Sequence, residues 1–122
     1  AENAMKYLFV LNDPPYGTER SYNAIRYARE LLKNTEAGNE LRVFLIGDAA
    51  ACAKAGQKVP QGFYNLESML QILLRHGAGV GVCGTCMDAR GMADADLVTG
   101  AVRGSMALLA EWTGWADKVI VF

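Results

Sequence analysis

The chain has 122 residues, of which 52 % are apolar and 20 % are charged, and its formal net charge is −1. This length suits one domain with one hydrophobic core, and the composition is that of a globular protein. The balanced charge disfavours a polyanionic partner such as nucleic acid. We expect no membrane partner either, because no apolar run approaches the length of a transmembrane helix and no signal peptide is visible.

Three cysteines are too few, and odd in number, for a disulfide scaffold. They favour a reducing compartment, so we expect a cytoplasmic protein. Residues 1–4, "AENA", precede Met5 and have the character of a cloning remnant. We therefore expect a single domain over residues 5–122.

The first half of the chain alternates between strand and helix patterns. Residues 6–11 form a short apolar run that ends in the turn cluster "NDPPYG", which is typical of a buried strand. Residues 18–34 place apolar side chains at helical spacing, with Thr18 as the N-cap. Residues 40–47 predict a second strand that ends at a glycine, and residues 49–55 predict a short helix.

The second half continues this alternation. A loop leads to a helix that Asn65 caps and that ends at His76. Residues 77–83 predict a third strand, thinned by glycine where a neighbouring element packs closely. Residues 105–113 predict another helix, and residues 118–122 a last strand. We therefore predict a three-layer α/β fold of flavodoxin-like outline, with a mainly parallel five-stranded sheet.

This fold indicates where a ligand would bind. In open parallel sheets ligands bind beyond the carboxyl ends of the strands. All the cysteines follow predicted strands; they are Cys52, Cys83 and Cys86. We expect the loop after the first strand to form one wall of a pocket there, through the side chains of Asn12, Tyr16, Glu19 and Arg20.

The stretch "GVCGTCMDARG", residues 81–91, carries the strongest chemical signal. Cys83, Cys86 and Arg90 are spaced by three and four residues, so a short helix after Cys83 would place them near one face. Backbone N–H groups at the start of that helix and a nearby guanidinium favour thiolate over thiol. The thiolate is the reactive species in alkylation, disulfide exchange and persulfide formation.

Other roles for the cysteine pair stay open. The two thiols would only pack in the core if they behave as small hydrophobes. A lone C-x-x-C supplies two of the four ligands of a closed zinc site, so zinc would have to be shared across an oligomer. His76, the single histidine, is expected at a helix C-terminus. A thioredoxin-like exchanger normally carries its motif after an early strand, which argues against that fold but not against a reversible disulfide.

Three stretches together resemble the DsrE/DsrF-like (YchN-type) family: "NDPPYGTERSYNA", "CGTCMDARG" and the ending "GSMALLAEWTGWADKVIVF". The resemblance covers residues 5–122. It implies a small α/β protein that assembles as a homotrimer or homohexamer and passes sulfur, as a cysteine persulfide, between donor and acceptor proteins. It also implies that Cys83, which precedes Arg90 and Gly91, is the sulfur carrier. Cys86 matches only a subset of members, so its role as resolving thiol, second carrier or spectator stays open.

We therefore expect a sulfur-relay or sulfurtransferase-like protein. Cys83 would be the nucleophile, Cys86 a partner thiol and Arg90 a charge stabiliser. No cofactor or metal is required, because a thiolate in a suitable electrostatic setting suffices. The alternatives are a non-catalytic module that binds a small ligand or metal in the same pocket, and a thiol–disulfide redox protein.

Overall fold

The computed structural model describes residues 4–33 and 38–122. Residues 1–3 of the predicted remnant, and Asn34 at the predicted end of the first helix, lie outside the described residues. The described strands form one sheet: β1 (Lys6–Leu11), β2 (Glu40–Leu45), β3 (Gly79–Cys83), β4 (Ala101–Gly104) and β5 (Lys118–Val121). All their pairings are parallel, and their order is β4-β3-β2-β1-β5.

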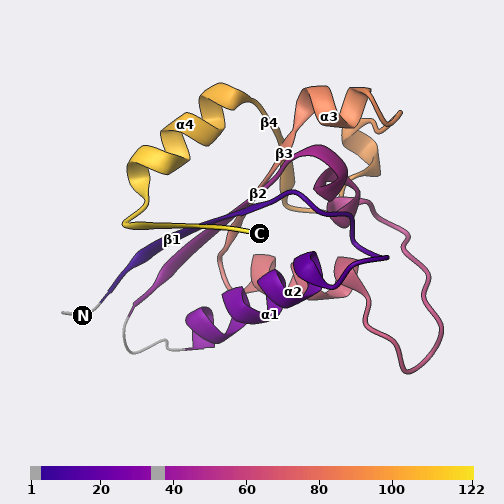
Figure 1. Ribbon diagram of the computed structural model, residues 1–122, viewed down its shortest axis with the longest axis horizontal. Coiled ribbons are helices and arrows are strands. Elements are labelled where there is room, and N and C mark those ends of the chain that lie inside the picture. The colour runs from indigo at the N-terminus through magenta and orange to yellow at the C-terminus, as the bar shows by residue number, and fades with distance from the viewer. Residues whose placement is uncertain (1–3, 34–37) are drawn as a thin grey trace.

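Helices cover both faces of this sheet, as Figure 1 shows. The α-helices are α1 (Arg20–Lys33), α2 (Leu66–Arg75), α3 (Gly84–Asp88) and α4 (Met106–Trp115), and the 3₁₀ helices are η2 (Gly47–Ala53) and η3 (Asp94–Asp96). α1 and α2 lie on one face, α4 lies on the other, and α3 lies at the end toward which the strands point. Right-handed crossovers explain this layering, because the chain steps from β1 to β4 in one direction and returns through α4 to β5. The predicted three-layer α/β class is confirmed.

The ends of the elements differ from the prediction where glycine turns the chain. β2 ends at Leu45, because Gly47 adopts a φ of 60° and begins η2. β3 begins at Gly79, since Gly77, with a φ of 90°, still belongs to the turn after α2. Thr18 lies before the first turn of α1, where its Oγ1 accepts a 3.4 Å hydrogen bond from the N–H of Arg20.

The predicted N-cap Asn65 is present, and Ser105, where the last predicted helix starts, is an N-cap as well. The side chain of Asn65 accepts a hydrogen bond from the N–H of Ser68 at the start of α2, and Ser105 does the same for Leu108 at the start of α4. Strand β4 was not located from the sequence. Among residues 4–33 and 38–122, no helix is long and apolar enough to cross a membrane.

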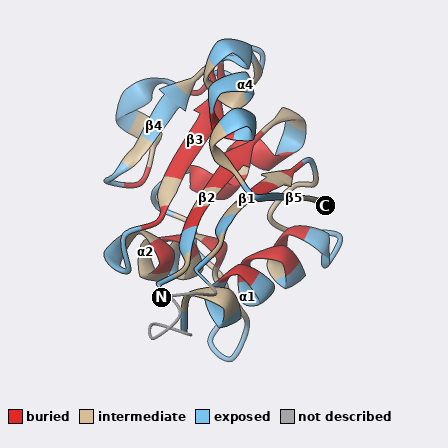
Figure 2. Ribbon diagram, turned by 90° about the vertical axis from the view of Figure 1, so that its left-hand side faces the viewer, coloured by how far each residue is buried: buried red, intermediate tan, exposed pale blue. Residues whose placement is uncertain are grey.

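The larger core lies between the sheet and the α1/α2 layer. Alternate residues of the central strands point into it, including Phe9, Val43 and Val82. Buried positions of α1 and α2, such as Ala28 and Leu70, complete it. Figure 2 shows the result: β2 and β3 run through the buried centre, whereas β4 and β5 form the more exposed edges.

The opposite face has a smaller core that depends on glycine. Trp112 of α4 packs there with Leu8, Phe44 and Cys83. The ring of Trp112 lies so close to β3 that a Cβ added at Gly81 would come within 3.1 Å of it and within 3.2 Å of Phe44. The predicted close approach of a neighbour to this glycine-rich strand is therefore present, and the neighbour is α4.

We predict that Gly81→Ala lowers the free energy of unfolding by about 1–3 kcal/mol, because the added methyl group overpacks the contact between α4 and the sheet. Gly114→Ala is the matched control. A Cβ at Gly114 meets no atom within 4 Å, so this change removes only the cost of glycine in a helix, and we expect a gain of roughly 0.5–1 kcal/mol. Urea denaturation measures both, and equal effects would contradict the packing argument.

Candidate functional site

The three cysteines lie at the end of β3 and on the segments that follow β2 and β3. Cys83 is the last residue of β3, Cys86 lies in α3, and Cys52 lies in η2. All three are free thiols. Cys52 is fully buried in the larger core, and its burial raises the pKa of this thiol to about 12. Cys52 is thus a core residue whose thiol stays protonated near neutral pH.

Cys83 is held as the more acidic thiol of the pair. Its side chain lies on the α4 face and is only 2 % exposed. Burial alone would raise its pKa, but hydrogen bonds from the Cys86 thiol, the Thr85 hydroxyl and the backbone N–H groups of both residues hold the pKa below its ordinary value. The Thr85 oxygen is 3.3 Å from the Cys83 sulfur. These donors all come from the turn that begins α3.

Cys86 has the opposite character. Its sulfur accepts a 3.1 Å hydrogen bond from the N–H of Gly47, the first residue of η2. Burial and the hydrogen bond with Cys83 nevertheless raise the pKa of Cys86, and Gly47 and Arg90 oppose this only in part. Cys83 therefore loses its proton more readily than Cys86, and the titration steps belong to the pair of thiols.

Arg90 connects α3 to η2. Its Nε and Nη2 donate to Asp48 Oδ1 at 3.3 and 2.7 Å, and its Nη1 donates to the carbonyl oxygen of Cys86 at 3.0 Å. The expected placement near the cysteine face is present, but the charge of Arg90 favours the thiolate of Cys86 and not chiefly that of Cys83. Asp48 was not selected from the sequence, although the residues after the second strand were expected at this edge.

A second arginine anchors the far side of α3, and no pattern in the sequence pointed to it. Arg103 of β4 donates from Nε to Asp94 at 2.7 Å and from Nη2 to Asp88 at 2.8 Å. A Cβ added at Gly84 would come within 2.6 Å of its Nη1 atom. Gly84 therefore leaves room for this guanidinium beside the residue that follows Cys83. Sequence reasoning missed Arg103 because its strand was not located.

The four side chains expected to form a pocket wall have other partners or are exposed. Asn12 donates from its side chain to the carbonyl oxygen of Phe122 at 3.0 Å, and only its backbone carbonyl oxygen lies near η2, 3.8 Å from a Cβ placed on Gly47. Glu19 is exposed just before α1, where its carbonyl oxygen accepts the N–H of Asn23.

Tyr16 and Arg20 have structural partners. The hydroxyl of Tyr16 donates to Gln57 at 2.6 Å and accepts from the N–H of Leu66 at 3.1 Å, so it caps the start of α2. Arg20, the first residue of α1, pairs with Asp13 of the preceding loop at 3.6 Å. The turn "NDPPYG" thus directs these two side chains into local packing and pairing.

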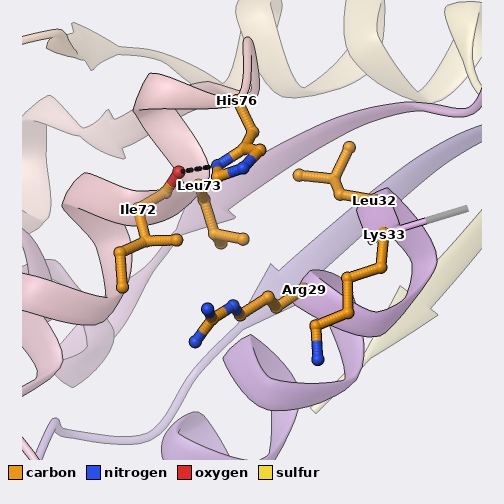
Figure 3. Close-up of a pocket in the computed structure, with 6 residues that line it drawn as sticks. All are labelled: Arg29, Leu32, Lys33, Ile72, Leu73 and His76. Atoms are coloured by element: carbon orange, nitrogen blue, oxygen red, sulfur yellow. Dashed lines mark hydrogen bonds between the residues drawn. The ribbon is translucent and has the colours of Figure 1, made fainter. Parts of the chain in front are cut away.

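His76 occupies the expected helix C-terminus, at the other edge of the sheet. Its Nδ1 donates to the carbonyl oxygen of Ile72 at 2.8 Å, as Figure 3 shows. A cavity of about 240 Å³ lies here between the ends of α1 and α2, lined by Arg29, Leu32, Lys33, Ile72, Leu73 and His76. In the part of the chain that the structure describes, no group of three or more His, Cys, Asp or Glu side chains is placed to hold a metal ion.

This geometry defines a small, all-parallel α/β protein with a thiol pair at the carboxyl edge of its sheet. The sequence model of the DsrE/DsrF-like family matches residues 5–122. The chain therefore belongs to the DsrE/DsrF-like family, as the motifs predicted.

Individual relatives agree with this assignment. Protein YchN of Escherichia coli K12 is 40 % identical over 117 residues, which cover 96 % of this chain and 98 % of YchN. The crystal structure of YchN matches with a TM-score of 0.88 over 97 % of this chain and 99 % of YchN. MTH1491, a protein of unknown function from Methanobacterium thermoautotrophicum, is 15 % identical and has a TM-score of 0.79 over 97 % and 99 % of the two chains, so it shares the fold.

A more distant relative has a named activity. Sulfurtransferase TusD of Salmonella typhi is 27 % identical over 131 residues, which cover 97 % of this chain and all of TusD.

We predict that Cys83 dominates alkylation by iodoacetamide near neutral pH. The hydrogen bonds at the α3 turn lower the Cys83 pKa, so the rise of rate with pH should have its midpoint below that of an ordinary cysteine. Cys83→Ser should remove the fast phase. Cys52→Ala is the control and should retain it, because Cys52 is buried and protonated at this pH. A fast phase that survives the loss of Cys83 would show that the nucleophile is another residue.

Proposed function

We propose that this protein carries sulfane sulfur as a persulfide on Cys83, within a sulfur relay. The observation that carries the proposal is the difference between the two thiols: hydrogen bonds from Thr85 and Cys86 lower the pKa of Cys83, whereas the pKa of Cys86 is raised. A thiolate is the form that attacks the outer sulfur of a donor persulfide. The likeness to the sulfurtransferase TusD supports the same chemistry.

The transfer joins a donor protein to an acceptor protein. The Cys83 thiolate takes the outer sulfur from a donor persulfide, and the donor leaves as a thiolate. An acceptor thiolate then attacks the outer sulfur on Cys83 and restores the Cys83 thiolate. Because Cys83 is nearly buried, loading requires a local shift of the five-residue helix α3. Such chemistry suits the reducing cytoplasm, where free thiols persist.

We predict that polysulfide adds the mass of one sulfur atom to the peptide that contains Cys83. The Cys86→Ser variant is the best starting point, since Cys83 is then the single cysteine at this turn. Mass spectrometry should find the added sulfur there, and a small thiol should remove it. The double variant with Cys83→Ser is the control. A sulfur-free Cys83 peptide in the folded single variant would contradict the proposal and leave a non-catalytic binding module.

The proposal extends to a homotrimer or homohexamer. α4 is almost entirely apolar in sequence, yet Trp112 is its single buried residue, and Met106 is 58 % exposed. Val119 is 42 % exposed and Val121 is 64 % exposed. Both lie on the same face of the sheet as α4, because they are paired with Leu8 and Val10 of β1. A second copy of the chain would cover this combined surface of α4 and β5, because closed symmetric assemblies bury exposed apolar patches of this kind.

We expect light scattering to find a trimer or hexamer at micromolar concentration. Changing Val119 and Val121 together to Asp should shift the protein toward the monomer, because charges would then have to be buried at the interface. Phe63→Ser is the matched control. Phe63 is 69 % exposed but lies in the loop before α2, so its loss should leave the assembly unchanged. A monomeric parent protein would refute this part of the proposal.

A further inference from the structure

The Cys83–Cys86 pair can do more than hold a sulfur atom. A persulfide on Cys83 has an inner sulfur, which is Sγ of Cys83, and an outer sulfur, which is the cargo. A relay step attacks the outer sulfur, whereas attack on the inner sulfur expels the cargo as hydrosulfide. Which event follows loading depends on which thiol reaches which sulfur.

Burial separates the two routes. The inner sulfur is 2 % exposed and lies in the cluster of Leu8, Phe44 and Trp112, so a thiol from another protein cannot approach it directly. Cys86 lies beside it: it packs against the same cluster, and it lies on the helical turn that begins at Cys83. An i, i+3 pair around one helical turn is close enough for a disulfide to form.

The surroundings of Cys86 fit an attacking thiol. Its sulfur accepts the N–H of Gly47 at 3.1 Å, a contact that stabilises negative charge on sulfur as the proton departs. Arg90, which is held by Asp48, donates to the backbone carbonyl oxygen of Cys86 at 3.0 Å. Cys86 is therefore positioned from η2 as well as from its own helix. A thiol that only filled space would have no need of the Gly47 contact.

We propose that Cys86 discharges the persulfide of Cys83 reductively, which releases hydrosulfide and leaves a Cys83–Cys86 disulfide. This inference rests on the proposed function, because Cys83 must first carry sulfur. The deprotonated persulfide, Cys83–S–S⁻, reacts with the Cys86 thiol. The bond between the two persulfide sulfurs breaks, the bond between the two cysteine sulfurs forms, and the Cys86 proton leaves on the expelled sulfur as HS⁻.

The electrons balance in this step. The sulfane sulfur is reduced to sulfide, and the two cysteine thiols are oxidised to the disulfide. The return to the dithiol needs two electrons from an external dithiol reductant, by ordinary thiol–disulfide exchange. With such a reductant the protein would turn over as a persulfide-dependent source of sulfide. Without one it would stop after a single release.

The test loads the full-length protein with polysulfide, removes excess reagent, and measures released sulfide and the state of the cysteines by mass spectrometry. The parent protein should release one sulfide per chain, without added thiol, as the intramolecular disulfide appears. Cys86→Ser and Cys86→Ala should keep the sulfur on Cys83 and lower the release by about tenfold or more. Two replacements guard against a folding defect in either, which circular dichroism would reveal. Cys52→Ala should behave as the parent.

The outcomes separate this inference from the function on which it rests. Sulfur that stays on Cys83 equally in the parent and the Cys86 variants overturns reductive discharge and leaves the relay intact. Release that yields no Cys83–Cys86 disulfide also overturns it. Failure of Cys83 to gain sulfur in the folded Cys86 variants overturns the proposed function itself, and the discharge step with it.

Discussion

Strands β2 and β3 run parallel and in register, with Leu45 opposite Val82, so the segments that follow them leave the sheet side by side. This pairing brings the N–H of Gly47 to the sulfur of Cys86, two groups that are 39 residues apart in sequence. It also lets Arg90 reach from α3 to Asp48. Both contacts between the two segments depend on the register of β2 and β3. A slip of one residue would move the side chains of the shifted strand to the opposite face of the sheet.

The second constraint on the site is the lack of side chains at two glycines of β3, on the face that α4 covers. Gly79, Gly81 and Cys83 point toward α4, and the missing side chains let Trp112 and Phe44 close over the strand. The floor of the site is therefore apolar, which disfavours charge on Cys83. Thiolate formation there depends on hydrogen bonds from the α3 turn, and these outweigh the cost of burial. The sulfur that we propose as the nucleophile thus lies in a core position without being exposed to bulk solvent.

The amino-acid pattern predicted the strands and helices that position the site better than the side chains around it. Apolar runs and caps located β1, β3, α2 and α4, because these signals are local. β4 escaped detection, since it has four residues, two of them are exposed, and glycine ends it. Arg103, the anchor of α3 on that strand, could not be found without it.

Side-chain direction in loops was the other limit. The loop after β1 was correctly expected near the carboxyl edge, and Asn12 lies there. Tyr16 turns instead toward Tyr64, whose ring stacks with its own at a centroid distance of 6.1 Å, and its hydroxyl binds the start of α2. Spacing also placed Arg90 on the cysteine face, but it could not reveal Asp48 as its partner. Long-range partners decide such orientations, and a pattern in sequence carries only local information.

In a persulfide on Cys83, burial would protect the inner sulfur from thiols of other proteins. An exposed carrier would lose its cargo to any thiol that attacked either sulfur, whereas a buried inner sulfur leaves only the outer one to a docking protein. Under the proposed discharge step, Cys86 would bypass that protection, because it lies on the helical turn that begins at Cys83 and packs against the same cluster. A chain with alanine at this position would keep the relay and lose the release. The fate of the sulfur would then depend on competition between the arrival of an acceptor and attack by Cys86. Gly47 and Arg90 would ease this attack, because they offset part of the rise in the Cys86 pKa that burial causes.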